Sequence, residues 1–363
     1  MKKVKEIALR FNAKGEGIVN YDAITKPNTD YFKEWHKNTK FAKKIWFRNE
    51  ETNEIDYKIA ISSDLIRTSV FNNHLKSPTI THHPKLMCDY FSNIDSLLRG
   101  WMFPVSGTLG FKRKSPVTLS KLIQTNNTKS VLEIGTKRGE IELKDIENLD
   151  EKKSTSLRNS ETIGHIEYSG TGFIDIQQLQ FLSLDDMFDR LAFNSDYFDT
   201  FKEIFKNKYG FELTSKHYLM LTESTKFPEK GVLFDTDILN LFVRHLLKNL
   251  YDFNVKRNTS YVHMSDLEYK PIYTDDSYND SVNDENGWIK INNKNEIDSI
   301  TFDYQIYYQE ANLDSISMLD EAKEYRKRNE AEEQKRKEEK KEADKIKRNL
   351  KKQQKENEQV SVD

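Results

Sequence analysis

The stretch IDYKIAISSDLIRTSVFNNHL, from Ile55 to Leu75, decides the fold because a strand runs directly into a helix there. Ser63 is a good N-cap for this helix, and Asp64 lies in its favourable first turn. Ser62, Ser63 and Arg67 therefore surround one helix N-terminus. Free N–H groups, hydroxyls and a guanidinium at such a position suit phosphate oxygens, which suggests a nucleic-acid backbone. The same residues also fit an ordinary capped helix with a solvated arginine.

Composition bounds the class of protein. The chain has 363 residues, 36% hydrophobic and 32% charged, enough to bury the core of one large or two modest domains. A mean hydropathy of −0.80 excludes an integral membrane protein. The start MKKVKEIALRFNAKGEG has no continuous apolar segment and no cleavage site, so a cytoplasmic protein is expected. Cys88 is the only cysteine, which excludes a disulfide framework and a cysteine-rich zinc module.

The net charge of −2 hides a strong asymmetry along the chain. Residues 1–145 hold 25 Lys and Arg against 16 Asp and Glu, a net charge of +9, whereas residues 146–319 hold 17 against 30, a net charge of −13. Residues 320–363 hold 15 against 13, a net charge of +2. The basic first part could follow a polyanion while the acidic part docks on the next copy, head to tail. A protein with an unevenly charged surface gives the same counts.

The first 100 residues predict a strand and two helical regions besides the opening stretch. Alternation of Ile7, Leu9 and Phe11 predicts a strand that ends in a loop at Gly15 and Gly17. Residues 30–46 are rich in aromatics and lysines and indicate a helix or an ordered insertion. Apolar residues at helical spacing then predict a helix that stops at Gly100. These residues are Leu86, Tyr90, Ile94, Leu97 and Leu98.

The middle of the chain predicts an excursion from the main sheet over residues 131–180. Two alternating runs in VLEIGTKRGEIEL, residues 131–143, flank a glycine and predict a hairpin with a basic tip. Residues 150–172 are rich in Ser, Thr, Gly and charge. FIDIQQLQFLS, residues 173–183, then resumes the alternation of a strand.

Further helices are predicted at about 184–193, 196–209 and 236–251, the last with a wide apolar face. Residues 274–298 are dense in Asp, Asn and Ser and predict a surface loop, and alternation over 300–308 predicts a late strand. From about 320 the chain is rich in Glu, Lys and Arg, with i, i+4 pairs such as Glu324/Arg328 and no apolar heptad seam. A solvated helical tail and a nucleic-acid-binding arm both fit this composition.

A second basic cluster follows Gly107 and Gly110. Phe111 to Lys114 places three cations beside an aromatic ring on a loop, which is what phosphate tracking and base stacking need. Arg99 leads into this loop, and Lys256 and Arg257 stand near Tyr261 as further candidates. Loop cations of this kind are also commonly just exposed.

The sequence offers little support for an enzyme. It contains none of the P-loop, GxSxG, HExxH or dinucleotide-binding motifs. His82, His83, Cys88 and Asp89 do not have the spacing of a metal site. His245 lies on a strongly apolar helix, where a structural role is favoured over that of a general base. We therefore expect no metal site, no cofactor and no catalytic residue.

Seven segments in order resemble the backbone subunit of CRISPR Cascade-type complexes in the RAMP superfamily, closest to the compact type I-F variant. The first four are ALRFNAKGEGIVNYD (8–22), IAISSDLIRTSVF (59–71), LLRGWMFP (97–104) and FKRKSPVTL (111–119). The others are GFIDIQQLQFLSLDDMFDR (172–190), GVLFDTDILNLFVRHLL (231–247) and FNVKRNTSYVHMSDLEY (253–269). The resemblance covers the body of the chain and excludes the tail, which departs from the family's pattern.

This resemblance implies an α+β fold: an RRM-like (ferredoxin-like) palm with finger insertions and a protruding thumb hairpin over residues 1–319, followed by a charged helical or partly disordered tail over 320–363. Copies would stack head to tail along guide RNA. By resemblance, Ser62, Ser63 and Arg67 would contact guide phosphates, and Arg99, Lys112, Arg113 and Lys114 would line the same groove. Phe173 and Ile174, within 155–177, would be thumb wedges that split a base step.

The function implied is that of a non-catalytic RNA-binding subunit. It would hold guide CRISPR RNA, bind other copies and other Cascade subunits, and present bases for pairing with target DNA. Two alternatives remain open: a superfamily ribonuclease that processes guide RNA or cleaves target RNA, and a structural protein whose helical tail docks a partner.

Overall fold

A computed structural model gives the structure of the protein. It describes residues 2–22, 41–48, 50, 53–71, 83–103, 110–138, 155–187, 190–222, 227–277, 281, 283–312, 316–318, 320–329, 331–332, 335–336 and 338–339. The chain forms two compact units, Met1–Ser215 with Val232–Tyr307 and Lys216–Gly231 with Tyr308–Asp363. Helices and several sheets occur together, as the predicted mixed class requires.

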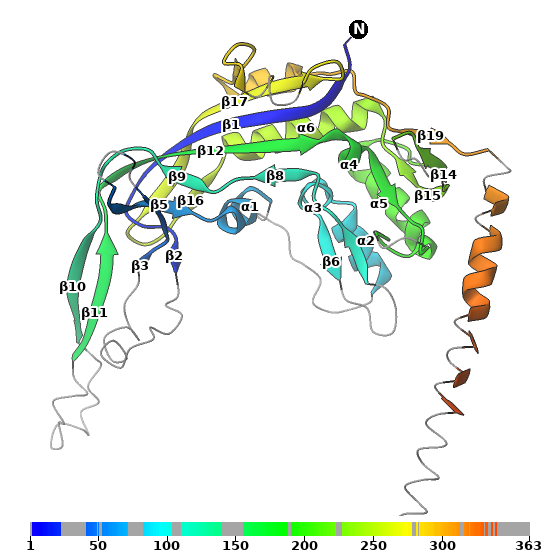
Figure 1. The fold of residues 1–363 in the computed structure, drawn as a ribbon, viewed down its shortest axis with the longest axis horizontal. Helices are drawn as coiled ribbons and strands as arrows, with labels where there is room; N and C mark the ends of the chain where they lie inside the picture. Colours follow the sequence, from blue (N-terminus) through cyan, green and yellow to red (C-terminus); the bar gives the residue numbers. More distant parts are fainter. Residues whose placement is uncertain are drawn as a thin grey trace, which may run out of the picture. The chain divides into compact units, whose positions relative to one another are not determined.

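A large sheet dominates the first unit, and its neighbouring strands pair antiparallel (Figure 1). Strand β1 (Val4–Glu16) lies at its centre between β17 (Tyr261–Tyr273) and β12 (His165–Asp175). In addition, β18 (Ile289–Lys290) pairs with β17, and β8 (Val117–Leu119) pairs with β12. The strand order is β16 (Asn254–Lys256), β17 (Tyr261–Tyr273), β1 (Val4–Glu16), β12 (His165–Asp175), β9 (Leu122–Gln124), β5 (Ile55–Ile61) and β4 (Lys44–Arg48).

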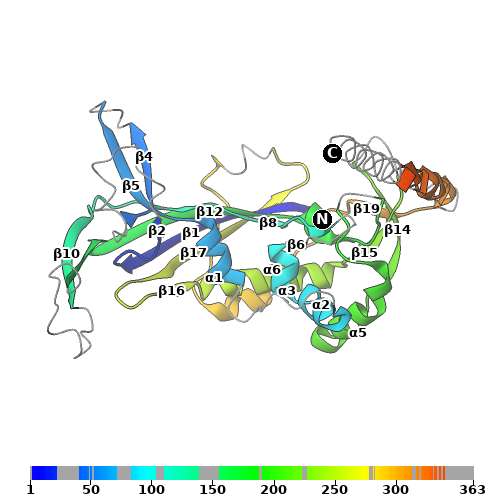
Figure 2. The same ribbon diagram turned by 90° about the horizontal axis from the view of Figure 1, so that it is seen from below.

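Helices cover one face of this sheet (Figure 2). On β1, Ile7, Leu9 and Phe11 are buried in the core, whereas Arg10 and Asn12 point to the opposite face. The predicted opening strand is thus confirmed, although it runs on to Glu16. The covering helices include α1 (Ser63–Phe71), α3 (Ile94–Arg99) and α6 (Thr236–Tyr251).

Aromatic rings in contact with one another extend this core between helices. Phe193 lies 5.5 Å from Phe91 and 4.9 Å from Phe201, measured between ring centroids. Phe234 lies 5.1 Å from Phe242 on α6. The rings join α2 (Pro84–Phe91), α5 (Phe198–Tyr209) and α6, and the predicted helices near 196–209 and 236–251 are confirmed. Burial of these large side chains is the main source of stability in this part of the unit.

The other elements are short. Three two-stranded ladders are β2 (Tyr21–Asp22) with β3 (Phe41–Ala42), β6 (Trp101–Phe103) with β7 (Phe111–Arg113), and β10 (Val131–Arg138) with β11 (Thr155–Thr162). The second unit contains β14 (Ser215–Met220) paired with β19 (Tyr308–Glu310). The remaining elements are α4 (Ile176–Gln180), β13 (Phe181–Ser183), β15 (Glu229–Leu233) and the 3-10 helices η3 (Ser195–Tyr197) and η4 (Lys294–Ser299).

Four sequence-based expectations are wrong. The helix ending at Gly100 is two helices, since Asn93 caps α3 by accepting the N–H of Asp95 at 2.9 Å. The predicted strand 173–183 contains α4, which Asp175 caps. The described residues of 184–193 form no helix, and those of 300–307 form only one isolated bridge, at Tyr304. In each case a cap or a tertiary contact overrides the local apolar pattern.

The predicted hairpin at 131–143 is also wrong. Residues 131–138 form one strand, β10, in which Gly135 lies opposite Arg158 of β11 rather than in a turn. The resulting ladder extends away from the main sheet (Figure 1). Residues 139–154 lie outside the described residues, as do residues 23–40 of the aromatic-rich segment.

Cys88 provides a test of this packing. Its side chain is fully buried, its Sγ lies 3.5 Å from the carbonyl of Tyr197, and burial raises the pKa of the thiol to about 11. At pH 8 its thiolate fraction should be about 100-fold below that of an ordinary cysteine. We expect iodoacetamide to label the native chain very slowly at pH 8 and the urea-unfolded chain rapidly, as measured by intact mass. Equal rates in both states would contradict the buried position.

Candidate nucleic-acid interface

The start of α1 is capped one residue earlier than the sequence predicts. The hydroxyl of Ser62 accepts the N–H of Leu65 at 3.3 Å, and its carbonyl accepts the N–H of Ile66 at 3.1 Å. Ser62 is therefore the N-cap and Ser63 the first helical residue. Both side chains are half-buried.

Arg67 has a structural role in this arrangement. Its guanidinium donates to the carbonyl of Val117 on β8 at 2.8 Å and to that of Arg99 on α3 at 2.7 Å. Burial, together with the charge of Arg99, lowers its pKa from the ordinary value. The guanidinium thus joins α1 to its two neighbours, and a phosphate contact would compete with these bonds.

The C-terminal end of α3 explains why two arginines point inward. The last four carbonyls of a helix have no partner within it. Here each one accepts a hydrogen bond: Ser96 from the N–H of Gly100 (2.8 Å), Leu97 from Nε of Arg113 (3.0 Å), Leu98 from Oγ of Ser115 (2.9 Å) and Arg99 from Arg67 (2.7 Å). We call this set of four bonds the α3 clamp.

Gly100 makes the α3 clamp possible. Its φ of 73° lies in the region that favours glycine, and a Cβ there would stand 2.4 Å from the carbonyl oxygen of Arg113 and 2.8 Å from the backbone nitrogen of Ser115. The chain after α3 and the chain around Arg113 can approach this closely only without a side chain at position 100. The predicted helix stop at Gly100 is confirmed.

Arg113 is a buried residue of β7, so the expectation that it is a surface cation on a loop is wrong. The residue is 7% exposed. Besides the carbonyl of Leu97, its guanidinium donates to the carbonyls of Phe181 at 2.7 Å and Gln178 at 3.3 Å. Cations in a basic run are usually solvated, but this one donates to two backbone segments, the end of α3 and residues 178–181.

Arg99, Lys112 and Lys114 lie on adjoining backbone segments, because β6 and β7 pair and Gly100 contacts the 113–115 backbone. Lys114 is exposed, and Arg99 and Lys112 are half-buried. The structure therefore brings these three predicted residues together next to the α3 clamp. Three neighbouring cations are able to attract consecutive phosphates.

Lys256 and Arg257 form a separate cluster. Both are exposed at the turn between β16 and β17, which the bond from the N–H of Arg257 to the carbonyl of Ser260 closes at 2.8 Å. This turn packs against the end of β1, where a Cβ at Gly17 would lie 2.6 Å from Cβ of Ser260. In register terms the turn lies at the level of Glu16 of β1 and β8 at the level of Ile7 to Leu9, seven to nine residues along the strand and roughly 25 Å away.

The predicted thumb wedges lie inside the main sheet. Ile174 is fully buried and pairs with Ile7 of β1 and Val117 of β8, and Phe173 is half-buried between Ala8 and Thr118. Strands flank both residues, so their predicted place on a protruding hairpin is wrong. Wedges and core strands use the same apolar residues, which is why the sequence did not separate them.

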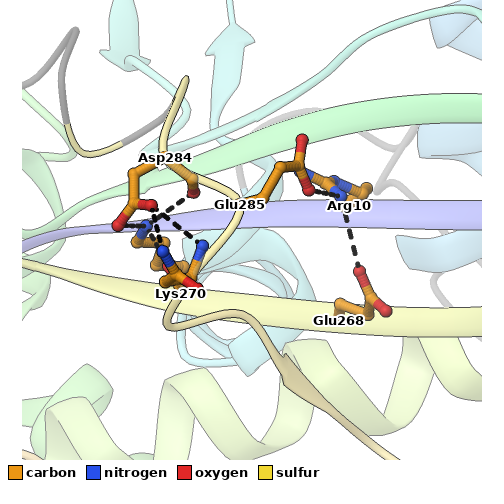
Figure 3. A network of polar contacts seen from close by, with 6 residues as sticks. Arg10, Glu268, Lys270, Asp284 and Glu285 are labelled. Atoms are coloured by element: carbon orange, nitrogen blue, oxygen red, sulfur yellow. Dashed lines mark hydrogen bonds and ion pairs between the residues drawn. The ribbon is translucent and has the colours of Figure 1, made fainter.

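An ion-pair network on the open face of the sheet was missed (Figure 3). Arg10 pairs with Glu285 at 2.9 Å and lies 4.3 Å from the ring of Trp288. Lys270, 9% exposed in its side chain, donates to the carbonyls of Asp284 (2.9 Å) and Asn286 (2.5 Å). The backbone N–H of Asn286 and the ammonium of Lys270 hold the pKa of Asp284 below its ordinary value. Residues 284–290, here termed the acidic strap, therefore bind two cationic side chains of this face, Arg10 and Lys270.

In the part of the chain that the structure describes, no three His, Cys, Asp or Glu side chains gather closely enough to hold a metal ion. No helix in that part is long and apolar enough to cross a membrane.

Comparison with known proteins defines the class of the chain: it is a CRISPR-associated protein. Residues 3–311 match the family described as "Type I-Fv CRISPR-associated protein Cas7fv-like". The chain belongs to this Cas7fv-like family, and the resemblance to a Cascade-type backbone subunit is confirmed. Membership also supports the coarser part of the predicted function, that of a crRNA-binding subunit.

One solved structure with a similar arrangement is titled "CRISPR RNA-guided surveillance complex, pre-nicking". It shares 7% sequence identity, covers 75% of this chain and 82% of its own, and gives a TM-score of 0.35. No curated protein matches the chain.

The α3 clamp yields a stability prediction. Arg113→Met should lower the free energy of unfolding by about 3 kcal/mol, because it leaves several buried carbonyls without donors. Lys114→Met, at the exposed neighbouring position, should change it by less than about 0.5 kcal/mol. Urea denaturation followed by circular dichroism measures both. Similar small losses in the two variants would show that Arg113 is not part of a buried clamp.

Proposed function

We propose that this chain is a non-catalytic backbone subunit that binds guide CRISPR RNA, oligomerises head to tail along it and presents it for pairing with target DNA. The family match over residues 3–311 carries the proposal, because it spans nearly the whole body. Specificity would come from base pairing, and affinity for the guide mainly from phosphate contacts.

The order of elements supports an RRM-like palm. Strand β1 is followed by α1, then β8 and β9, β12, α6 and β17, which is the β-α-β-β-α-β sequence of ferredoxin-like folds. In space these strands stand in the order β17, β1, β12, β9, with the two helices on one face. Insertions then supply the remaining ladders. On this proposal the β10–β11 ladder is the thumb, in place of residues 173–174.

The guide-binding surface is accordingly redefined. Lys112 and Lys114 next to the α3 clamp, together with Lys256 and Arg257 on the β16–β17 turn, are the strongest candidates for phosphate contacts. Arg67 and Arg113 act indirectly by fixing the backbone beneath the first cluster. Clusters roughly 25 Å apart along the sheet suit an extended ligand that contacts each in turn.

Self-association is the second part of the proposal. The net charges of +9 over residues 1–145 and −13 over 146–319 support contacts between unlike regions of successive copies. Such heterologous contacts propagate along a guide rather than closing into a dimer. Other Cascade subunits would bind the ends of the assembly.

Guide binding is tested by neutralising the two lysines next to the α3 clamp, of which Lys114 is exposed and Lys112 half-buried. Lys112→Gln with Lys114→Gln should weaken binding of a labelled crRNA and reduce the slope of log affinity against log salt by about 1 for each phosphate that the variant no longer neutralises. Fluorescence anisotropy at several salt concentrations measures this slope. Lys206→Gln on α5, an exposed lysine paired with Glu212, is the matched control. An unchanged slope in the double variant would remove this cluster from the interface.

The ribonuclease alternative has one supporting contact. Nε2 of His245 lies 2.7 Å from Oδ1 of Asp95, which also accepts a hydrogen bond from Asn249 at 2.7 Å. Asp95 could orient a catalytic histidine in this way, but the contact also joins α3 to α6. We expect the purified subunit to leave guide and target RNA intact with and without magnesium, in gel assays. Cleavage that His245→Ala abolishes would establish the alternative.

A further inference from the structure

The β4–β5 ladder carries large apolar side chains that remain in contact with solvent. Trp46 is 63% exposed, Ile55 74% and Phe47 36%. Strand β4 is the last strand of the main sheet, and the two strands rise from the sheet on the side away from α1 and α6 (Figure 2). A contiguous group of exposed apolar side chains with charged residues around it indicates an interaction site more often than single exposed apolar residues do.

The register places rings and cations on the same face of the ladder. Lys44, Trp46 and Arg48 of β4 alternate onto the face that also carries Tyr57 and Ile55 of β5. The rings of Trp46 and Tyr57 meet edge to face at 5.3 Å between centroids. This face therefore presents two aromatic rings with a cationic side chain on either side along β4.

Two ammonium groups converge on the ring of Tyr57. Nζ of Lys44 lies 4.3 Å from its centroid and Nζ of Lys129, from the loop before β10, lies 5.0 Å from it. Lys129 also pairs with Asp56 at 2.6 Å, and the hydroxyl of Tyr57 lies 3.2 Å from that of Ser130. These contacts fix Tyr57 and both ammonium groups in place while the neighbouring indole of Trp46 stays largely exposed.

We propose that this face, the Trp46 platform, binds a single-stranded polynucleotide. Bases would stack on Trp46, and Lys44, Arg48 and Lys129 would contact the phosphates of the same strand. Stacking tolerates any base, which suits a ligand whose sequence changes from one assembly to the next. A protein strand added to the edge of β4 would use its backbone groups and would leave this combination of rings and cations without a function.

The platform lies outside the guide surface proposed above, since it shares no residue with either cation cluster. Its strand has two possible sources, the guide RNA or a separate DNA strand. The chemistry of recognition is the same for both, so the experiment must separate them.

The test uses the full chain purified with its guide. Fluorescein-labelled dT20 and U20 are titrated into the wild type and into Trp46→Ala with Tyr57→Ala, and affinity is read by anisotropy. We expect about a tenfold loss of affinity in the double variant, since each stacked base contributes substantially. Trp46→Phe, which keeps a ring, should retain most of the affinity. Leu86→Ala, which removes a 50% exposed apolar side chain from α2, outside both cation clusters, is the matched control.

Extraction of bound RNA from each variant separates the sources. Loss of oligonucleotide binding with a full amount of guide assigns the platform to a separate strand, whereas loss of the guide itself assigns it to the guide. The proposal would be overturned if the double variant kept the oligonucleotide affinity and guide content of the wild type. It would also be overturned if the double variant differed from the wild type only in its sedimentation coefficient. A wild-type chain that carries no guide but binds dT20 through Trp46 would contradict the proposed function and leave the platform standing.

Discussion

The candidate interface depends on one constraint: each carbonyl at the C-terminal end of α3 needs a hydrogen-bond donor. A helix of six residues leaves most of its own carbonyls without internal partners, and in a buried position each needs a donor. Arg67, Arg113 and Ser115 supply these donors from α1, β7 and the segment before β8. Three elements distant in sequence are thereby fixed around one helix end, and the positive guanidinium groups also suit the negative end of the helix dipole.

This constraint divides the cations of the first half into two kinds. Those that bind carbonyls cannot also neutralise phosphates at no cost, because losing a buried charged donor is expensive. Others lie next to them in the chain and are exposed, such as Lys114, which directly follows Arg113. A basic run in the sequence is therefore a mixture of internal donors and surface charges, and the net charge of a segment overstates the charge available to a ligand.

Sequence periodicity predicted the elements whose apolar pattern is long. The strand through Ile7 and Phe11 and the helix 236–251 follow from it, because each buries one continuous face. Short elements were predicted poorly. Side-chain caps at Asn93 and Asp175 start helices where the apolar pattern suggested continuity or a strand, and such caps act over only three residues.

The candidate site was predicted in part. The end of the helix at Gly100 and the strand-to-helix turn at Ser62 could be predicted from the sequence, and both lie next to cations of the candidate site. The burial of Arg113 could not be predicted, since it depends on the carbonyls of residues 97, 178 and 181, which lie 16 to 68 positions from it in the chain. The Trp46 platform was missed because its aromatic residues suggested a helix or an insertion, whereas a two-stranded register gathers them on one face.

The acidic strap has a consequence for the path of any bound strand. In the RRM-like palm proposed for this chain, the middle of the sheet is the surface that such folds commonly expose to RNA. A strand bound there would have to displace the strap and break the bonds from the Lys270 ammonium to Asp284 and Asn286 and the ion pair between Arg10 and Glu285. The protein's own carboxylates thus cover the centre of the open face and keep phosphate away from it. A bound polynucleotide would have to pass the ends of the strands and not the middle of the sheet.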